Sequence, residues 1–107
     1  MEIVNEILES YNEYLLKIPN GALYIAENLR TENITQSLEA ILDFSEGMKW
    51  ITETNLLLKQ HGVELSLDIK TINEFLLEIN EGLEREDFTL VSDIFEYEIA
   101  QYFSEIK

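Results

Sequence analysis

The stretch from residue 33 to residue 62, NITQSLEAILDFSEGMKWITETNLLLKQHG, is the longest uninterrupted helical pattern in the chain, and it decides the fold. Asn33 is a residue type that caps helix starts, Gln36 can reach back to it, and Gly62 is a type that ends helices in the left-handed conformation. Trp50 and Leu57 widen the apolar surface, so we expect this helix to contact neighbours on more than one side. Its main apolar face, at steps of three and four residues, consists of Ile34, Leu38, Ile41, Phe44, Met48, Ile51, Asn55 and Leu58.

The segment before this stretch carries an apolar stripe that crosses a proline without losing its phase. Pro19 removes one backbone hydrogen bond and crowds the carbonyl four residues back, so it kinks or breaks a helix. One interpretation is a single kinked helix from about Glu2 to Arg30, and the other is two short helices that meet at a Pro-Asn-Gly turn. We favour the kinked helix because a turn gives no reason to preserve the phase. The stripe consists of Val4, Ile7, Tyr11, Tyr14, Ile18, Ala22, Ile25 and Leu29.

Two further helices follow. The third is predicted to start near Ser66 or Asp68, either of which can cap it, and the fourth runs from Phe88 to about Ile106 with Asp87 as its cap. Both show apolar residues at helical spacing, and no part of the chain alternates as a strand does. The third stripe is Ile69, Ile72, Leu76, Ile79 and Leu83, and the fourth is Leu90, Val91, Ile94, Phe95, Ile99, Tyr102 and Phe103.

Four helical stripes with short connections predict an all-α fold, an antiparallel up-down-up-down four-helix bundle whose first helix is kinked or broken at Pro19. The chain has 107 residues, which we interpret as a single domain over residues 1–107. Its one proline and four glycines leave few places to turn. Gly47 falls inside the longest helix, where we expect it to admit the close approach of a neighbouring helix or aromatic ring.

The net charge of −15 comes from 22 acidic and 7 basic residues. Such a surface repels phosphate backbones and anionic membranes, so direct binding to nucleic acid or lipid is not expected. It suits a basic protein partner, or imitation of a nucleic acid. The start of the chain lacks the pattern of a signal peptide, no apolar run approaches membrane-spanning length, and we expect a cytoplasmic location.

Two stretches carry a resemblance beyond their periodicity. They are EGMKWI at residues 46–51 and DFTLVSDIFEYE at residues 87–98. They resemble patterns in small acidic all-helical proteins of unknown function from Gram-positive bacteria, and the similarity covers about residues 33–107. The resemblance implies a bacterial, cytoplasmic, all-helical protein, and it implies no catalytic residue.

One candidate site is a polar pocket built around a carboxylate. Glu98 falls near the apolar row of the last helix, where a buried carboxylate needs a partner or a raised pKa. We expect Lys49 to be that partner, next to Trp50 and with Tyr97 nearby. Asn55 lies on the apolar face of the longest helix, where it fixes register or contacts a ligand. A structural ion pair or a tyrosine hydrogen bond accounts for the same residues.

The second candidate is a partly exposed groove of aromatic and leucine side chains that accepts a partner helix. Its predicted partner-binding residues are Tyr11, Tyr14, Leu57 and Tyr97. Three consecutive leucines, residues 56–58, cover more than one side of a helix, so an apolar strip is left for a protein partner or for a second copy in a homodimer. Core packing with each tyrosine hydroxyl at the surface is the alternative.

The sequence offers little support for catalysis. A di-metal carboxylate bundle needs Glu-x-x-His pairs on two helices, and this chain has one histidine, His61, which follows Leu58 by three residues. The chain has no cysteine, no Gly-x-Ser-x-Gly and no glycine-rich phosphate loop. We therefore expect no enzyme, no metal site and no cofactor. The expected function is a small adaptor or chaperone-like module with an apolar groove rimmed by carboxylates, and the alternative is an acidic nucleic-acid mimic that inhibits a DNA-binding protein.

Overall fold

The computed structural model describes residues 2–106, and it is helical throughout except for the connections. The elements are α1 (Glu2–Arg30), α2 (Ile34–Gln60), α3 (Ile69–Glu84) and a last helix made of α4 (Phe88–Asp93), η1 (Ile94–Ile99) and α5 (Ala100–Glu105). The prediction of an all-α fold with four helices is confirmed, and no strand occurs in the described part of the chain.

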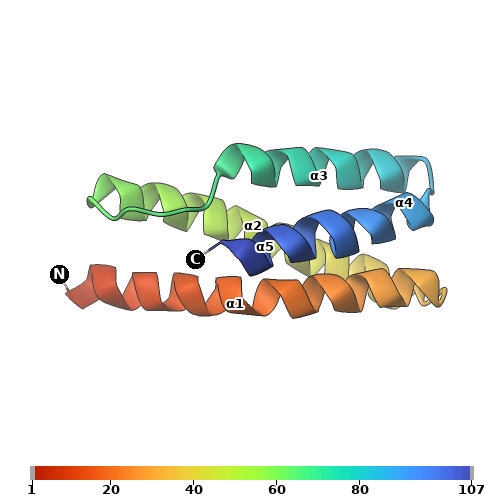
Figure 1. Cartoon of the computed structure of the whole chain (residues 1–107), viewed down its shortest axis with the longest axis horizontal. Helices are drawn as coiled ribbons and strands as arrows, with labels where there is room; N and C mark the ends of the chain where they lie inside the picture. The colour runs from red at the N-terminus through yellow and green to blue at the C-terminus, as the bar shows by residue number, and fades with distance from the viewer. Residues whose placement is uncertain (1, 107) are drawn as a thin grey trace.

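The helices lie side by side in an elongated molecule of 46 × 22 × 20 Å (Figure 1). In Figure 1 the colour runs rightward along α1, leftward along α2, rightward along α3 and leftward along the last helix. α1 packs against both α2 and the last helix, whereas α3 packs mainly against the last helix and touches α2 less. α1 and α2 therefore share a long seam, and one flank of α2 has little cover.

α1 continues through Pro19 as one helix from Glu2 to Arg30, so the two-helix interpretation is wrong. Its stripe keeps its phase on both sides of the proline, and Tyr11, Ile18, Ala22, Ile25 and Leu29 are all buried. The burial of this continuous row offsets the hydrogen bond that the proline ring removes.

Each of the three connections begins with the same helix ending. At the end of α2, the N–H of Val63 bonds the carbonyl of Leu58 and the N–H of Gly62 bonds that of Lys59, while Gly62 has φ +81°. This is the Schellman pattern, and it confirms the prediction for Gly62. The same pairs of bonds end α1 and α3, where the left-handed positions are held by Glu32 (φ 62°) and Glu86 (φ 55°).

Two of the three predicted caps form. The side chain of Asp68 accepts the N–H of Lys70, and that of Asp87 accepts the N–H of Leu90. Asn33 stands at the start of α2, but its side chain makes no cap bond, so that prediction is wrong. Its amide instead donates to Asn28 Oδ1 and Thr31 Oγ1, because the turn through Glu32 directs it back to the end of α1.

The last helix contains a π-helical turn, η1, that the sequence pattern did not predict. One row of buried residues in this helix repeats every four positions, at Val91, Phe95, Ile99 and Phe103. An α-helix has 3.6 residues per turn, so three four-residue steps exceed three α-turns by about one residue. The π turn takes up that residue and keeps the whole row on the core side.

The core is continuous through all four helices. Ile72 and Ile79 of α3 are buried, as are Met48 and Ile51 of α2, whereas Leu38, which was expected on the buried face of α2, is 43% exposed. Ser37 takes its place in the interior, where its hydroxyl donates to the carbonyl of Asn33. The buried row passes through positions 37, 41, 44 and 48, so Leu38 lies one residue, about 100° around the helix, away from it.

Candidate protein-docking groove

Tyr14 lies at the centre of the seam between α1 and α2. Its hydroxyl occupies the position that a Cβ atom of Gly47 would take, so the glycine admits an aromatic ring, as predicted. On its other side the Tyr14 ring packs against Trp50, with 5.8 Å between ring centroids. Burial raises the pKa of Tyr14, and the charge of Asp43 raises it further. Tyr14 is therefore fixed in place as a ridge across the seam.

A hollow opens on each side of this ridge, and we call the two together the α1–α2 groove. The first hollow has a volume of about 230 Å³ and is lined mainly by apolar side chains, among them Ile18, Ile25 and Phe44, with Gly21 and Ala40 leaving the space. The second has a volume of about 260 Å³ and is lined by Ser10, Glu13, Tyr14, Lys17 and Trp50. Tyr14 and Lys17 line both hollows, so the two hollows lie next to each other along the α1–α2 seam.

The structure places the predicted partner-binding residues in different environments. Tyr14 lines the groove, and Leu57 is 40% exposed further along α2. Tyr11 is only 1% exposed, so it offers no surface to a partner, and that part of the prediction is wrong. Its hydroxyl accepts a hydrogen bond of 2.9 Å from the Asn55 side-chain amide, which makes the pair a buried tie between α1 and α2.

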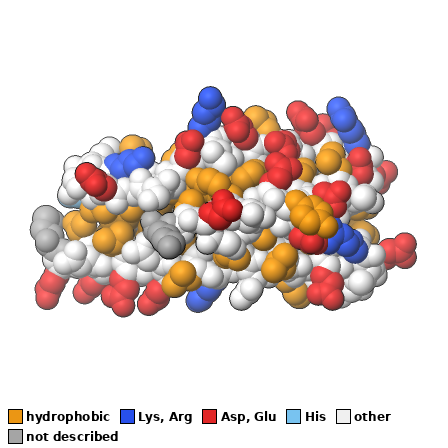
Figure 2. Space-filling model, viewed as in Figure 1, with side chains coloured by type: hydrophobic (Ala, Val, Ile, Leu, Met, Phe, Trp, Pro, Cys, Tyr) orange, Lys and Arg blue, Asp and Glu red, His pale blue; other side chains and the backbone are white. Residues whose placement is uncertain are grey.

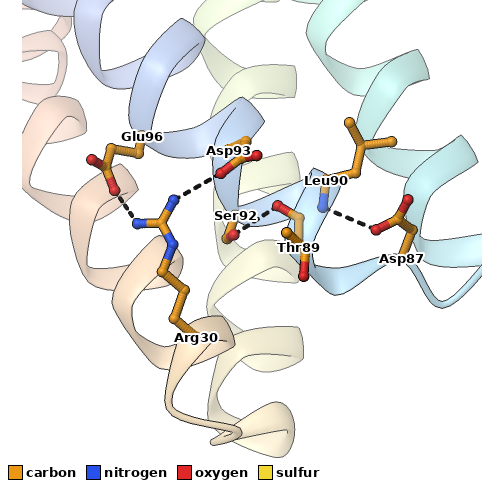
Figure 3. Close-up of polar contacts among 7 residues, drawn as sticks. All are labelled: Arg30, Asp87, Thr89, Leu90, Ser92, Asp93 and Glu96. Carbon is orange, nitrogen blue, oxygen red and sulfur yellow. Dashed lines mark hydrogen bonds and ion pairs between the residues drawn. The ribbon is translucent and has the colours of Figure 1, made fainter.

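Tyr97 is 62% exposed, but it lies on the last helix, next to α1 rather than in the groove. Its ring faces the Arg30 guanidinium at 5.8 Å. Figure 3 shows Arg30 reaching from α1 to Asp93, at 2.9 Å, and to Glu96. These bonds raise the pKa of Arg30 and lower the pKa of Glu96, so the cluster joins the end of α1 to the last helix.

The predicted polar pocket does not form, because its residues point to different neighbours. Trp50 packs on Tyr14 and Asn55 bonds Tyr11. Lys49 is exposed and makes no ion pair, since both ion pairs among residues 2–106 belong to Arg30. The Glu98 side chain is largely exposed, and the pKa of its carboxyl is raised by its partial burial and by the nearby carboxylate of Glu78 on α3. The expected Lys49–Glu98 pairing is therefore wrong, because the last helix faces α3 and α1 rather than α2 at that level.

The groove depends on small residues that the sequence analysis did not single out. Gly21 and Ala40 leave the first hollow open, and a Cβ atom added at Gly21 would meet nothing within 4 Å. Lys17 and Asp43 stand at its edge. Small residues on adjacent faces of α1 and α2 were the available signal, but which faces meet is a tertiary property.

Residues 2–106 contain no cluster of three or more histidine or carboxylate side chains placed to hold a metal ion. No helix in that range combines the length and hydropathy that a membrane crossing needs.

Comparison with known families places the chain in a group without an assigned activity. A family model described as a domain of unknown function, DUF8042, matches residues 6–107. The chain belongs to this family. The match includes most of α1, so it extends further than the similarity expected from about Asn33 onward. Neither the curated proteins nor the solved structures yield a match.

Proposed function

We propose that this DUF8042 protein is a non-enzymatic interaction module that binds a cationic amphipathic helix of a partner protein in the α1–α2 groove. The observation that carries the proposal is the pair of hollows on either side of a fixed aromatic ridge. A helix laid along such a groove buries its apolar face and leaves its polar face in water.

The charge of the molecule supports a basic partner. The chain carries a net charge of −15, and Figure 2 shows acidic side chains along the outer edge of α1 and over α3. Asp43 lines the first hollow and Glu13 the second, with Lys17 as the cation between them. Complementary charge speeds the encounter and selects the partner, while the apolar hollows supply affinity.

The proposal takes the four helices as an antiparallel up-down-up-down bundle whose first helix bends at Pro19, and it places the protein in the cytoplasm. An acidic mimic of a nucleic acid is the other class that the charge permits. It needs two rows of carboxylates at duplex-like spacing, whereas the acids here are spread over every long helix. We therefore favour the docking module.

Trp50 is the single tryptophan and lies in the groove, so its fluorescence reports occupancy. We expect a synthetic amphipathic helix of leucine and lysine to shift the emission and to bind at micromolar concentration. A scrambled peptide of the same composition, and an analogue with glutamate in place of lysine, should bind at least about tenfold more weakly. Equal binding of the scrambled peptide would contradict the proposal, since charge alone would then account for it.

Two matched variants locate the site. Tyr14→Asp should weaken binding at least about tenfold, because it removes the ridge and places a charge between the hollows. Leu16→Asp adds the same charge at a site on α1 that is 79% exposed and lines neither hollow, so it should leave the affinity unchanged. Circular dichroism checks that both variants fold. Equal loss in both would contradict a site at the groove, and a dimer that Tyr14→Asp converts to a monomer in light scattering would show that a second copy is the occupant.

A further inference from the structure

The two hollows are separated by a fixed step along both helices that form them. On α1, the first hollow is centred near residue 20 and the second near residue 13. On α2, the first is bounded by residues 40–44 and the second by Trp50. At a rise of 1.5 Å per residue, the hollow centres are separated by about 10 Å along α1 and by about 12 Å along α2. The two helices thus give similar spacings, and seven residues is the helical repeat nearest to them that returns to the same face.

We infer that the occupant of the α1–α2 groove carries two large apolar anchor residues seven positions apart, one for each hollow. This inference rests on the proposed function and specifies the partner's sequence pattern. Seven residues of an α-helix span about 10.5 Å and return to nearly the same face, so a helix lying along the groove presents both anchors toward it. Tyr14 then lies under the two turns between the anchors.

The volumes of the two hollows limit the size of the anchor side chains. An apolar cavity of about 150 Å³ is large enough to hold benzene. The hollows measure about 230 and 260 Å³, so each accepts a phenylalanine or leucine side chain. The first hollow has the more apolar lining, and Gly21 and Ala40 give it its depth.

The charged side chains at the two hollows indicate which residues of the partner helix should flank its anchors. Asp43 stands at the edge of the first hollow and Glu13 at the edge of the second, so each anchor is matched by a lysine or arginine next to it. Lys17 lies between the hollows and disfavours a basic residue midway between the anchors. The occupant is therefore a helix whose basic residues flank each anchor and leave the middle uncharged or acidic.

Three helical peptides of identical composition test the spacing. Each is an alanine and lysine helix with two phenylalanines on one face, placed four, seven or eleven positions apart. Measured by Trp50 fluorescence, the seven-residue spacing should bind at least about tenfold more tightly than the other two. Equal binding of the three at the groove would overturn the spacing and leave the proposed function standing. Failure of all three to bind would overturn both.

A filled hollow provides the second test. Gly21→Leu adds a side chain to the lining of the first hollow without a clash of its Cβ atom, and it removes a glycine from a helix, so we expect the fold to be retained, which circular dichroism checks. It should abolish the preference for the seven-residue spacing. Asn20→Leu makes a comparable change at the next, exposed position, which lines neither hollow, and should retain the preference. An unchanged preference in Gly21→Leu would overturn the inference.

Discussion

At the scale of single residues, Glu32 and Glu86 occupy backbone conformations that suit glycine. Both have positive φ values, of 62° and 55°, and both stand at the left-handed position of a helix ending. A side chain in this region costs about 1–2 kcal/mol from the contact of its Cβ atom with the backbone. Gly62 holds the same position after α2 without that cost. The turns after α1 and α3 therefore carry strain that the turn after α2 does not.

Replacing Glu86 by glycine should stabilise the fold. Glu86→Gly removes the strain of the left-handed conformation, but it also increases the conformational entropy of the unfolded chain. Because the first effect is the larger, we expect the free energy of unfolding to rise by about 0.5–1 kcal/mol. Urea titration followed by circular dichroism measures it. Glu81→Gly is the matched control, because it removes the same charge from an exposed position inside α3, where glycine costs about 1 kcal/mol. Destabilisation by both variants would show that Glu86 is not strained.

At the scale of helices, glycines set how closely neighbours approach. A Cβ atom on Gly82 of α3 would lie 2.6 Å from Cγ2 of Val91, a fully buried residue of α4. Gly47 plays the same part for Tyr14 between α2 and α1. Gly21, by contrast, meets nothing within 4 Å and only opens the first hollow. Glycines inside helices thus have different roles that depend on what faces them.

Replacing Gly82 and Gly21 by alanine should change the free energy of unfolding in opposite directions. Gly82→Ala forces α3 and α4 apart and should lower the free energy of unfolding by about 1–2 kcal/mol, even after the gain in helix propensity. Gly21→Ala should raise it by about 0.5–1 kcal/mol. Thermal denaturation of both variants measures the difference. Adding Val91→Ala to Gly82→Ala should cost less than the sum of the single changes, and strict additivity would contradict the contact.

The π turn of the last helix gives a second expectation at this scale. Deleting Tyr97 removes one exposed residue from η1 and changes the buried spacing to the four-three-four pattern of an α-helix. We expect this variant to fold with about the same helical content. Deleting Leu77, which is equally exposed at 62% but lies in the regular helix α3, rotates half of the buried row by about 100° and should unfold the protein. Circular dichroism compares them, and similar losses would contradict the explanation of the π turn.

At the scale of the whole molecule, charge and shape determine behaviour in solution. The accessible surface is 6891 Å², about a tenth more than the roughly 6,200 Å² expected of a monomer of this mass, because the molecule is elongated. Its charge of −15 is spread over that surface and opposes the compact state through self-repulsion.

Added salt should therefore stabilise the protein. Raising NaCl from about 0.01 M to about 0.15 M shortens the screening length from about 30 Å to about 8 Å. We expect the free energy of unfolding to rise by about 1 kcal/mol, which is about 4–8 °C in Tm. Differential scanning calorimetry measures it. A variant with Glu2→Gln, Glu6→Gln and Glu9→Gln should depend less on salt, and a Tm that falls with salt would mean that the Arg30 ion pairs outweigh the repulsion.

The sequence by itself determined the number of helices, most of their ends and most of the buried residues. These depend on local chemistry, as with the caps at Asp68 and Asp87 and the glycine ending at Gly62. The sequence also carries a four-residue repeat from Val91 to Phe103 that accounts for the π turn. This repeat can be recognised only when the structure shows which apolar residues are buried.

Only the tertiary structure decided the site. Tyr11 and Tyr14 are three positions apart on the same stripe, yet one is buried against Asn55 and the other forms the ridge of the groove. Lys49 and Glu98 have opposite charges that suit a pair, but their helices face different neighbours. A helix pattern fixes which side is apolar, whereas the hollows arise where two apolar sides meet at small residues, and that depends on how the helices are rotated and offset against each other.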